Sequence, residues 1–159
     1  MYKIFIVEDD QVIAAAMAEH LKSWGWDARC AVNFGDVLAE FAAFGPQLVL
    51  LDISLPFYNG YHWCGQIRQC SKVPVIFISS AADNLNIVMA MNMGGDDFIA
   101  KPFDLDVLTA KVQAMLRRTY ELDVYKRQPL SLPWRFTLTG SMISKNCRIR
   151  MRRVTTSGS

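Results

Sequence analysis

The sequence predicts one α/β domain, built on a five-stranded, doubly wound parallel sheet, followed by a short basic tail. Five apolar runs recur at regular distances before residue 101, and amphipathic stretches of helical period separate them. Strands that alternate with helices form right-handed β-α-β units, so the strands run parallel and helices cover both faces of the sheet. Charge marks the tail: residues 1–122 hold nine Lys/Arg and fourteen Asp/Glu, whereas residues 123–159 hold eight Lys/Arg and one Asp.

The expected strands are the five apolar runs, at 2–7, 27–32, 47–52, 74–79 and 97–100. The third run is apolar without alternation from Leu48 to Leu51, which is typical of a strand covered on both faces. The expected helices cover 11–24, 35–44, 60–70, 84–93 and 104–119. We expect the first helix to bury one face, made of Val12, Ile13, Ala16, Met17, His20, Leu21 and Trp24.

Composition favours a globular protein of the cytoplasm. Apolar residues make up 52% of the chain and charged residues 20%, as in a chain with a packed core. No apolar run approaches the roughly 20 residues that span a bilayer, so no membrane association is expected. Acids follow the first apolar run directly, which is unlike a secretory signal. The cysteines lack metal-ligand spacing and are expected to be reduced thiols: Cys30, Cys64, Cys70 and Cys147.

Polar side chains gather where four of the five strands end. Ligands of such sheets bind outside the carboxyl ends of the strands, which meet at one rim. In strand order, the polar residues at this rim are Glu8, Asp9, Asp10, Asp52, Ser79, Ser80 and Lys101. Each residue alone has a simpler interpretation, as a turn cap, a helix N-cap, a strand-end hydroxyl or a solvated lysine. Their shared position at one rim favours a functional site.

The chemistry of this set indicates phosphoryl transfer. Carboxylates that lie close together raise one another's pKa unless a cation is present, and Mg²⁺ suits a site of one or two carboxylates, waters and a phosphate. A lysine opposite them can neutralise a transferred phosphoryl group as a point charge. A carboxylate such as Asp52, exposed by the loop after its strand, can be the nucleophile that forms an aspartyl-phosphate.

Four motifs in order, "IFIVEDD", "LVLLDISLPFYNG", "VIFISSA" and "GGDDFIAKPF", resemble the receiver domains of two-component response regulators. The resemblance covers about residues 1–120 and implies a flavodoxin-like fold with strand order 2-1-3-4-5. It also implies a Mg²⁺ site formed by Glu8, Asp9, Asp52 and the backbone carbonyl of Ser54. In this family, the residue at Asp52 takes a phosphoryl group from the phosphohistidine of a sensor histidine kinase.

The same resemblance implies a switch that reads the phosphoryl group. Lys101 is expected to contact the phosphoryl group, and the Lys101-Pro102 bond is expected to be cis. Ser79 is expected to swing towards the phosphoryl group, while Phe98 turns inward behind it.

The stretch "GGDDFIAKPFDLDVLTAKVQAMLRR" is similar to OmpR-type regulators, whose effector is a winged-helix DNA-binding domain. The stretch "FYNGYHWCGQIR" is similar to regulators that answer cell-envelope antibiotics such as bacitracin. The OmpR-type resemblance implies a homodimer, promoted by phosphorylation, through the fourth helix, fifth strand and fifth helix. On this face the expected residues are Ile87, Asp96, Asp97, Val107 and Lys111. Lys111 of one subunit is expected to meet Asp97 of the other.

Residues 121–159 are expected to form a basic linker and tail with no independent fold. A winged-helix effector needs roughly a hundred residues, so we expect a truncated or frame-shifted remnant, with DNA binding only through the missing effector. The alternative is a natural basic tail that touches nucleic acid or an acidic partner by charge alone. The residues that support this alternative are Arg148, Arg150, Arg152 and Arg153.

Three classes of function compete. The leading one is a phosphorylation-dependent switch that controls transcription in its full-length form, and the alternative is a single-domain receiver acting as a phosphorelay carrier or protein-binding switch. An aspartate-nucleophile phosphatase is disfavoured because such enzymes need a second acid two residues after the nucleophile, and Ser54 stands there. Dinucleotide binding is disfavoured because "EDDQ" follows the first strand in place of a glycine-rich turn. We therefore expect a regulator and no enzyme.

Overall fold

A computed structural model describes residues 1–80, 84–121, 134–136 and 142–144 of the chain. Its main sheet has five parallel strands in the order β2-β1-β3-β4-β5, so the predicted fold class and strand order are confirmed. The strands are β1 (Lys3–Val7), β2 (Asp27–Cys30), β3 (Leu48–Asp52), β4 (Val75–Ser79) and β5 (Asp97–Ala100).

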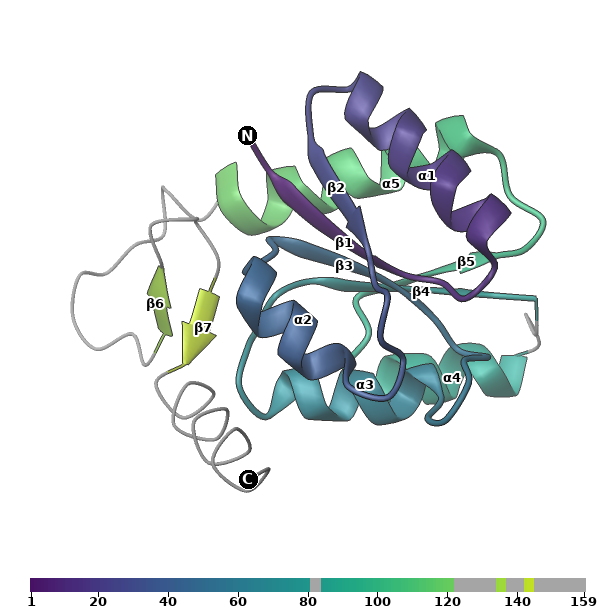
Figure 1. The fold of residues 1–159 in the computed structure, drawn as a ribbon, viewed down its shortest axis with the longest axis vertical. Coiled ribbons are helices and arrows are strands. Elements are labelled where there is room, and N and C mark those ends of the chain that lie inside the picture. The colour runs from purple at the N-terminus through teal and green to yellow at the C-terminus, as the bar shows by residue number, and fades with distance from the viewer. Residues whose placement is uncertain (81–83, 122–133, 137–141, 145–159) are drawn as a thin grey trace.

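Helices cover both faces of this sheet, with α1 and α5 on one face and α2, α3 and α4 on the other (Figure 1). They are α1 (Gln11–Ser23), α2 (Val37–Phe44), α3 (Gly60–Arg68), α4 (Asn84–Asn92) and α5 (Leu105–Leu116), and a π-helical turn, η1 (Arg117–Glu121), follows α5. In the described part of the chain, no helix is long and apolar enough to cross a membrane.

The tail contributes two short strands to the described residues. β6 (Trp134–Phe136) pairs antiparallel with β7 (Met142–Ser144). The rest of 122–159 lies outside the described residues, and this part includes Cys147, Arg148, Arg150, Arg152 and Arg153. The expectation that residues 121–159 have no independent fold therefore stays a prediction.

The core explains why the third strand is apolar throughout. All five residues of β3 are buried, because helices cover the sheet on both sides. Leu48 and Leu50 belong to the core beneath α1 and α5, whereas Val49 and Leu51 belong to the core beneath α2 and α3. Asp52 continues the same strand, so its carboxylate is carried to the end of the most buried part of the sheet.

The buried face of α1 differs from the predicted one. The residues that α1 buries are Ala14, Met17, Ala18 and Leu21, which recur at i, i+3, i+4 and i+7. Met17 and Leu21 were predicted correctly. The prediction was wrong for Ala16, which is exposed, for Val12, which is 80% exposed, and for Trp24, which is 50% exposed. Trp24 follows the helix and stacks on Trp26 with ring centroids 6.0 Å apart, so it does not point into the core.

Candidate functional site

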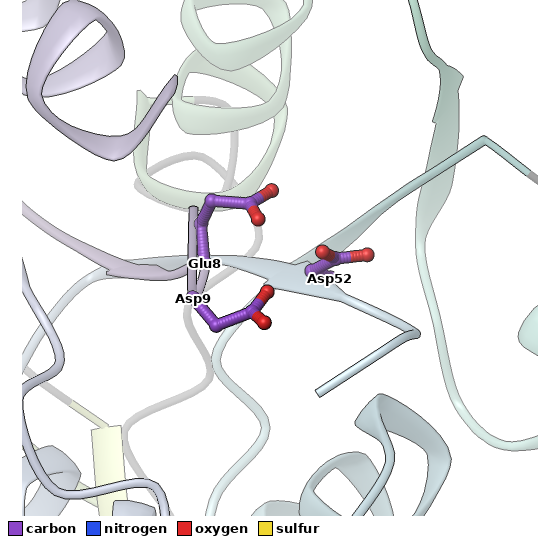
Figure 2. Close-up of side chains that lie close together, drawn as sticks. All are labelled: Glu8, Asp9 and Asp52. Atoms are coloured by element: carbon purple, nitrogen blue, oxygen red, sulfur yellow. The ribbon is translucent and has the colours of Figure 1, made fainter. Parts of the chain in front are cut away.

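Three carboxylates converge at the carboxyl ends of β1 and β3. Each of Glu8, Asp9 and Asp52 offers an oxygen within 4.8 Å of the oxygens of the other two, and Figure 2 shows the three side chains around one space. Glu8 and Asp52 are buried, while Asp9 is exposed, so the expectation that the loop after β3 exposes Asp52 is wrong. Asp10 has a different job, because its Oδ1 accepts hydrogen bonds from the backbone N–H of Val12 and Ile13 and caps α1. The carboxylate of Asp10 therefore serves the helix and is not one of the three that converge.

Lys101 lies between the two buried carboxylates. Its Nζ is 2.5 Å from Oε2 of Glu8 and 3.0 Å from Oδ2 of Asp52, and its side chain is mostly buried. The Lys101-Pro102 peptide bond that follows β5 is cis, as expected. Among the described residues, one ammonium group thus stands beside the three converging carboxylates, which leaves an excess of negative charge.

The two buried charges shift each other's titration. Burial raises the pKa of Glu8, and the contact with Lys101 offsets this only in part. Burial acts to lower the pKa of Lys101, but the contacts with Glu8 and Asp52 outweigh it, so the pKa of Lys101 ends above its ordinary value. Lys101 is therefore a firmly protonated ammonium group at neutral pH.

The oxygens of the rim fit a hard divalent cation. Oε2 of Glu8 is buried and accepts no hydrogen bond of good geometry from the described residues, although the ammonium of Lys101 lies beside it. One ammonium group therefore faces two buried carboxylates, Glu8 and Asp52, so their negative charge is compensated only in part. Mg²⁺ prefers carboxylate and carbonyl oxygens and keeps several waters, so one exposed and two buried acids suit it.

The loop after β3 packs closely against Asp52. Oδ1 of Asp52 accepts a hydrogen bond from the backbone N–H of Ser54 (3.2 Å), and the N–H of Gly60 donates to the carbonyl of Ile53 (2.8 Å). A Cβ atom on Gly60 would collide with the carbonyl oxygen of Asp52. Glycine is therefore required at this position because the first turn of α3 approaches the backbone of the nucleophile candidate.

The middle of this loop is strained. Phe57 has a φ of 67°, and the N–H of Tyr58 donates to the carbonyl of Pro56 (2.8 Å) across it. Such a φ costs free energy for a bulky side chain. Phe57 is 83% exposed, so burial of its ring does not offset this strain.

The two expected switch residues lie behind the rim. Ser79 is fully buried at the end of β4, and its carbonyl accepts the N–H of Lys101 (2.9 Å). Phe98 is half-buried in β5 and packs against the core beneath α2 and α3. The two residues thus lie on β4 and β5, which are neighbouring strands of the sheet.

Sequence reasoning missed a role for Arg68. At the end of α3, its guanidinium donates to the carbonyls of Gly94 (2.9 Å) and Val73 (2.5 Å) and to Oδ2 of Asp96 (2.8 Å). The same oxygen of Asp96 accepts the N–H of Val75 (2.9 Å). Asp96, expected on a dimer face, thus has partners within its own chain that join α3, β4 and the turn before β5. An arginine near the end of a helix gives no signal of these distant contacts.

Asp97 and Lys111, expected to pair between subunits, also meet within one chain. Nζ of Lys111 lies 3.2 Å from both carboxylate oxygens of Asp97 and 3.4 Å from the carbonyl of Phe98. The pair is partly exposed. On the same face, Ile87 is half-buried and Val107 is exposed.

An apolar groove of about 450 Å³ lies beside the rim. Its lining residues come from α1, the end of β4 and the segment after β5: Val12, Ile13, Ala16, Met17, Ser80, Lys101, Pro102, Phe103 and Leu105. Lys101 is shared between the groove and the acidic site. The exposure of Val12 follows from its place in this groove.

A doubly wound α/β domain with three acids and a lysine at its strand ends is the architecture of a receiver, and comparison with known proteins agrees. Residues 4–113 match the model of the response regulator receiver domain. The chain therefore belongs to the response regulator receiver family of two-component systems. Membership in this family supports a signalling role and not an enzymatic one.

The curated relatives are regulators longer than this chain. The uncharacterized transcriptional regulatory protein YvcP of Bacillus subtilis is 52% identical over 76% of this chain and 51% of its own length. The sensory transduction protein BceR of Halalkalibacterium halodurans is 48% identical over 76% of this chain and 52% of its own length. The chain thus spans about half the length of these relatives.

Solved receiver structures show the same fold. The N-terminal domain of the nisin resistance regulator NsrR, described as a lantibiotic response regulator, is 50% identical with a TM-score of 0.68, over 74% of this chain and 99% of that one. The beryllium-fluoride-activated receiver domain of Klebsiella pneumoniae RstA is 30% identical with a TM-score of 0.69, over 72% and 98%.

Proposed function

We propose that this chain is a cytoplasmic signalling switch that accepts a phosphoryl group on Asp52 from the phosphohistidine of a sensor histidine kinase. The observation that carries the proposal is the position of Asp52. Its carboxylate ends the buried β3, lies 3.0 Å from the ammonium of Lys101 and lies within 4.8 Å of two further acids. A carboxylate nucleophile needs positive charge beside it to approach an anionic phosphoryl group.

Each polar side chain at the rim would have one role in the phosphoryl transfer. An oxygen of Asp52 forms a bond to phosphorus while the bond from phosphorus to the histidine nitrogen breaks, and the nitrogen keeps the electron pair. Lys101 exchanges its contacts with Glu8 and Asp52 for contacts with the phosphoryl oxygens, where its charge is needed. Glu8, Asp9, Asp52 and the backbone carbonyl of Ser54 would hold Mg²⁺, which, when bound, offsets the negative charge of the acids and of the phosphoryl group.

The readout of the phosphoryl group would use Ser79 and Phe98. The hydroxyl of Ser79 would turn to the phosphoryl group from the end of β4, and Phe98 would turn inward behind it. Because both residues lie next to Lys101 and β5, their rearrangement would reach the surface made by α4, β5 and α5.

The apolar groove supports a protein as the phosphodonor. A helix of the kinase that fills the groove beside α1 would bury apolar area next to Lys101, and so would bring its phosphohistidine to the rim. Val12, exposed in this structure, would be covered in that complex.

We propose a homodimer through α4, β5 and α5 as the phosphorylated form. Asp97 and Lys111 lie on this surface and would exchange their contact within the chain for the same contact across a two-fold axis. The relatives named as transcriptional and sensory transduction regulators support transcription control by a longer form, in which a DNA-binding effector follows the receiver.

The test is Mg²⁺-dependent labelling by a small phosphodonor. Incubation with acetyl phosphate and Mg²⁺ should add about 80 Da, the mass of one phosphoryl group, to the intact chain. The addition should vanish with excess chelator and in Asp52→Ala. Full labelling of Asp52→Ala would contradict the proposal.

A further inference from the structure

α4 presents an unusual surface for an exposed helix, because none of its nine residues is charged. Among its described side chains, Ala90 is buried, while Leu85, Val88, Met89 and Met91 are exposed, and Met93 is exposed directly after the helix. An exposed helix that carries apolar side chains and no charge is a candidate interaction surface in a folded protein. Three of these residues are methionines, whose thioether sulfur is the part most easily oxidised.

The methionines of α4 divide into two rows. Successive helical residues are about 100° apart, so residues four apart share a row and residues two apart lie nearly opposite. Met89 and Met93 form one row, on the side of α3: the thiol of Cys64 donates to the carbonyl of Met93 (3.2 Å), and a Cβ on Gly65 would lie 4.0 Å from Cε of Met93. Ile87 and Met91 form the other row.

The second row points away from α3. In the sheet, β5 is the edge strand after β4, so the side of α4 away from α3 is the side of β5 and of the proposed dimer face. Met91 is 37% exposed there and Met89 is 42% exposed on the other row. The two residues are thus similarly exposed, but only Met91 shares a row with Ile87.

We propose that Met91 is an oxidation site whose sulfoxide weakens the dimer; this rests on the dimer face of the proposed function. The oxidant is a peroxide such as hydrogen peroxide. A lone pair of the Met91 sulfur forms a bond to one peroxide oxygen, the O–O bond breaks, and the other oxygen leaves as water after proton transfer. The sulfur loses two electrons and the peroxide gains them.

The sulfoxide oxygen is a strong acceptor where the thioether was apolar. In the dimer it would be removed from water beside Ile87, whose side chain has no donor to offer it. Burial of the apolar Met91 side chain would favour dimerisation, whereas burial of its sulfoxide would oppose dimerisation. Because the dimer would cover the Met91 side chain, dimerisation should also slow the oxidation of Met91 by restricting the access of peroxide.

The test compares three proteins before and after hydrogen peroxide: the parent, Met91→Leu and the matched control Met89→Leu. Sedimentation with Mg²⁺ and beryllium fluoride measures the dimer dissociation constant. We expect oxidation to raise it about tenfold or more in the parent and in Met89→Leu, and to leave it unchanged in Met91→Leu. Peptide mass mapping should find one added oxygen on Met91, and none on the buried Met17 and Met115.

Two outcomes would overturn the inference, and they are distinguishable. If the untreated parent does not dimerise with beryllium fluoride, the proposed dimer fails, and the inference fails with it. If the parent dimerises, and oxidation on Met91 leaves its dissociation constant unchanged or weakens Met91→Leu equally, the dimer stands and the inference is wrong.

Discussion

At the scale of single residues, the clustered acids of the rim are expected to favour Mg²⁺ binding and to lower stability, because they repel one another. Asp9 stands beside two buried acids, and Lys101 supplies the one ammonium group in contact with them among the described residues. Asp9→Asn should therefore weaken Mg²⁺ binding, on the order of tenfold, while leaving the free energy of unfolding without Mg²⁺ unchanged or higher, because a repulsive charge is removed. Tryptophan fluorescence titrated with Mg²⁺ and a urea melt measure the two quantities.

Asp10 offers the matched control for Asp9. It is the adjacent acid, but its carboxylate caps α1, and asparagine caps a helix equally well. Asp10→Asn should change neither Mg²⁺ affinity nor stability appreciably. An Asp9→Asn protein that binds Mg²⁺ like the parent but unfolds more easily would show that Asp9 serves the fold.

The strain at Phe57 gives a second prediction. Its φ of 67° suits glycine, and its exposed ring contributes little to the core. Phe57→Gly should raise the free energy of unfolding by about 0.5–1 kcal/mol, the relief of left-handed strain less the added freedom of glycine in the unfolded chain. Phe57→Ala removes the same ring but keeps the strain, so in a urea melt it should show no such gain. Equal stability of the two variants would mean that the backbone at Phe57 is not strained.

At the scale of elements, strands and helices could be predicted from continuous sequence patterns. A side-chain contact such as that of Arg68 with Asp96, between residues far apart in the sequence, could not. The run from Leu48 to Leu51 identified a central strand, because burial on both faces leaves no polar position in it. The predicted buried face of α1 was partly wrong, because Val12 lines a groove beside the site and is exposed there. Helical periodicity cannot distinguish a residue that lines a groove from one that lies in the core. The rim residues followed from strand ends alone, whereas the contact of Arg68 with Asp96 joins residues 28 apart and has no local pattern.

The surface made by α4, β5 and α5 gives a prediction at this scale. Asp97→Lys and Lys111→Asp should each weaken the dimer formed with beryllium fluoride, because like charges would face each other across the two-fold axis. The double variant restores opposite charges and should recover part of the affinity. Sedimentation measures all four proteins. If both single variants dimerise like the parent, this surface does not form the dimer.

At the scale of the whole molecule, Tyr120 contacts segments of the receiver that lie far from it in the sequence. Its hydroxyl donates to the carbonyl of Gln47 (2.6 Å), and its ring lies 5.7 Å from that of Tyr2. We therefore expect a chain truncated after Glu121 to keep the thermal midpoint of the full chain. Tyr120→Phe should lose about 1 kcal/mol, the contribution of one hydrogen bond. A large loss of stability on truncation would show that residues beyond Glu121 pack on the receiver.

Phosphorylation of Asp52 is the central step of the proposed switch, and the most direct measurement locates the phosphoryl group. After incubation with acetyl phosphate and Mg²⁺, the acyl phosphate is reduced with borohydride and the digested peptides are mapped by mass spectrometry. We predict that the reduced residue is Asp52, at the end of β3, and that the peptide carrying Glu8 and Asp9 is unchanged. Modification at Glu8 or Asp9, with Asp52 intact, would contradict this prediction.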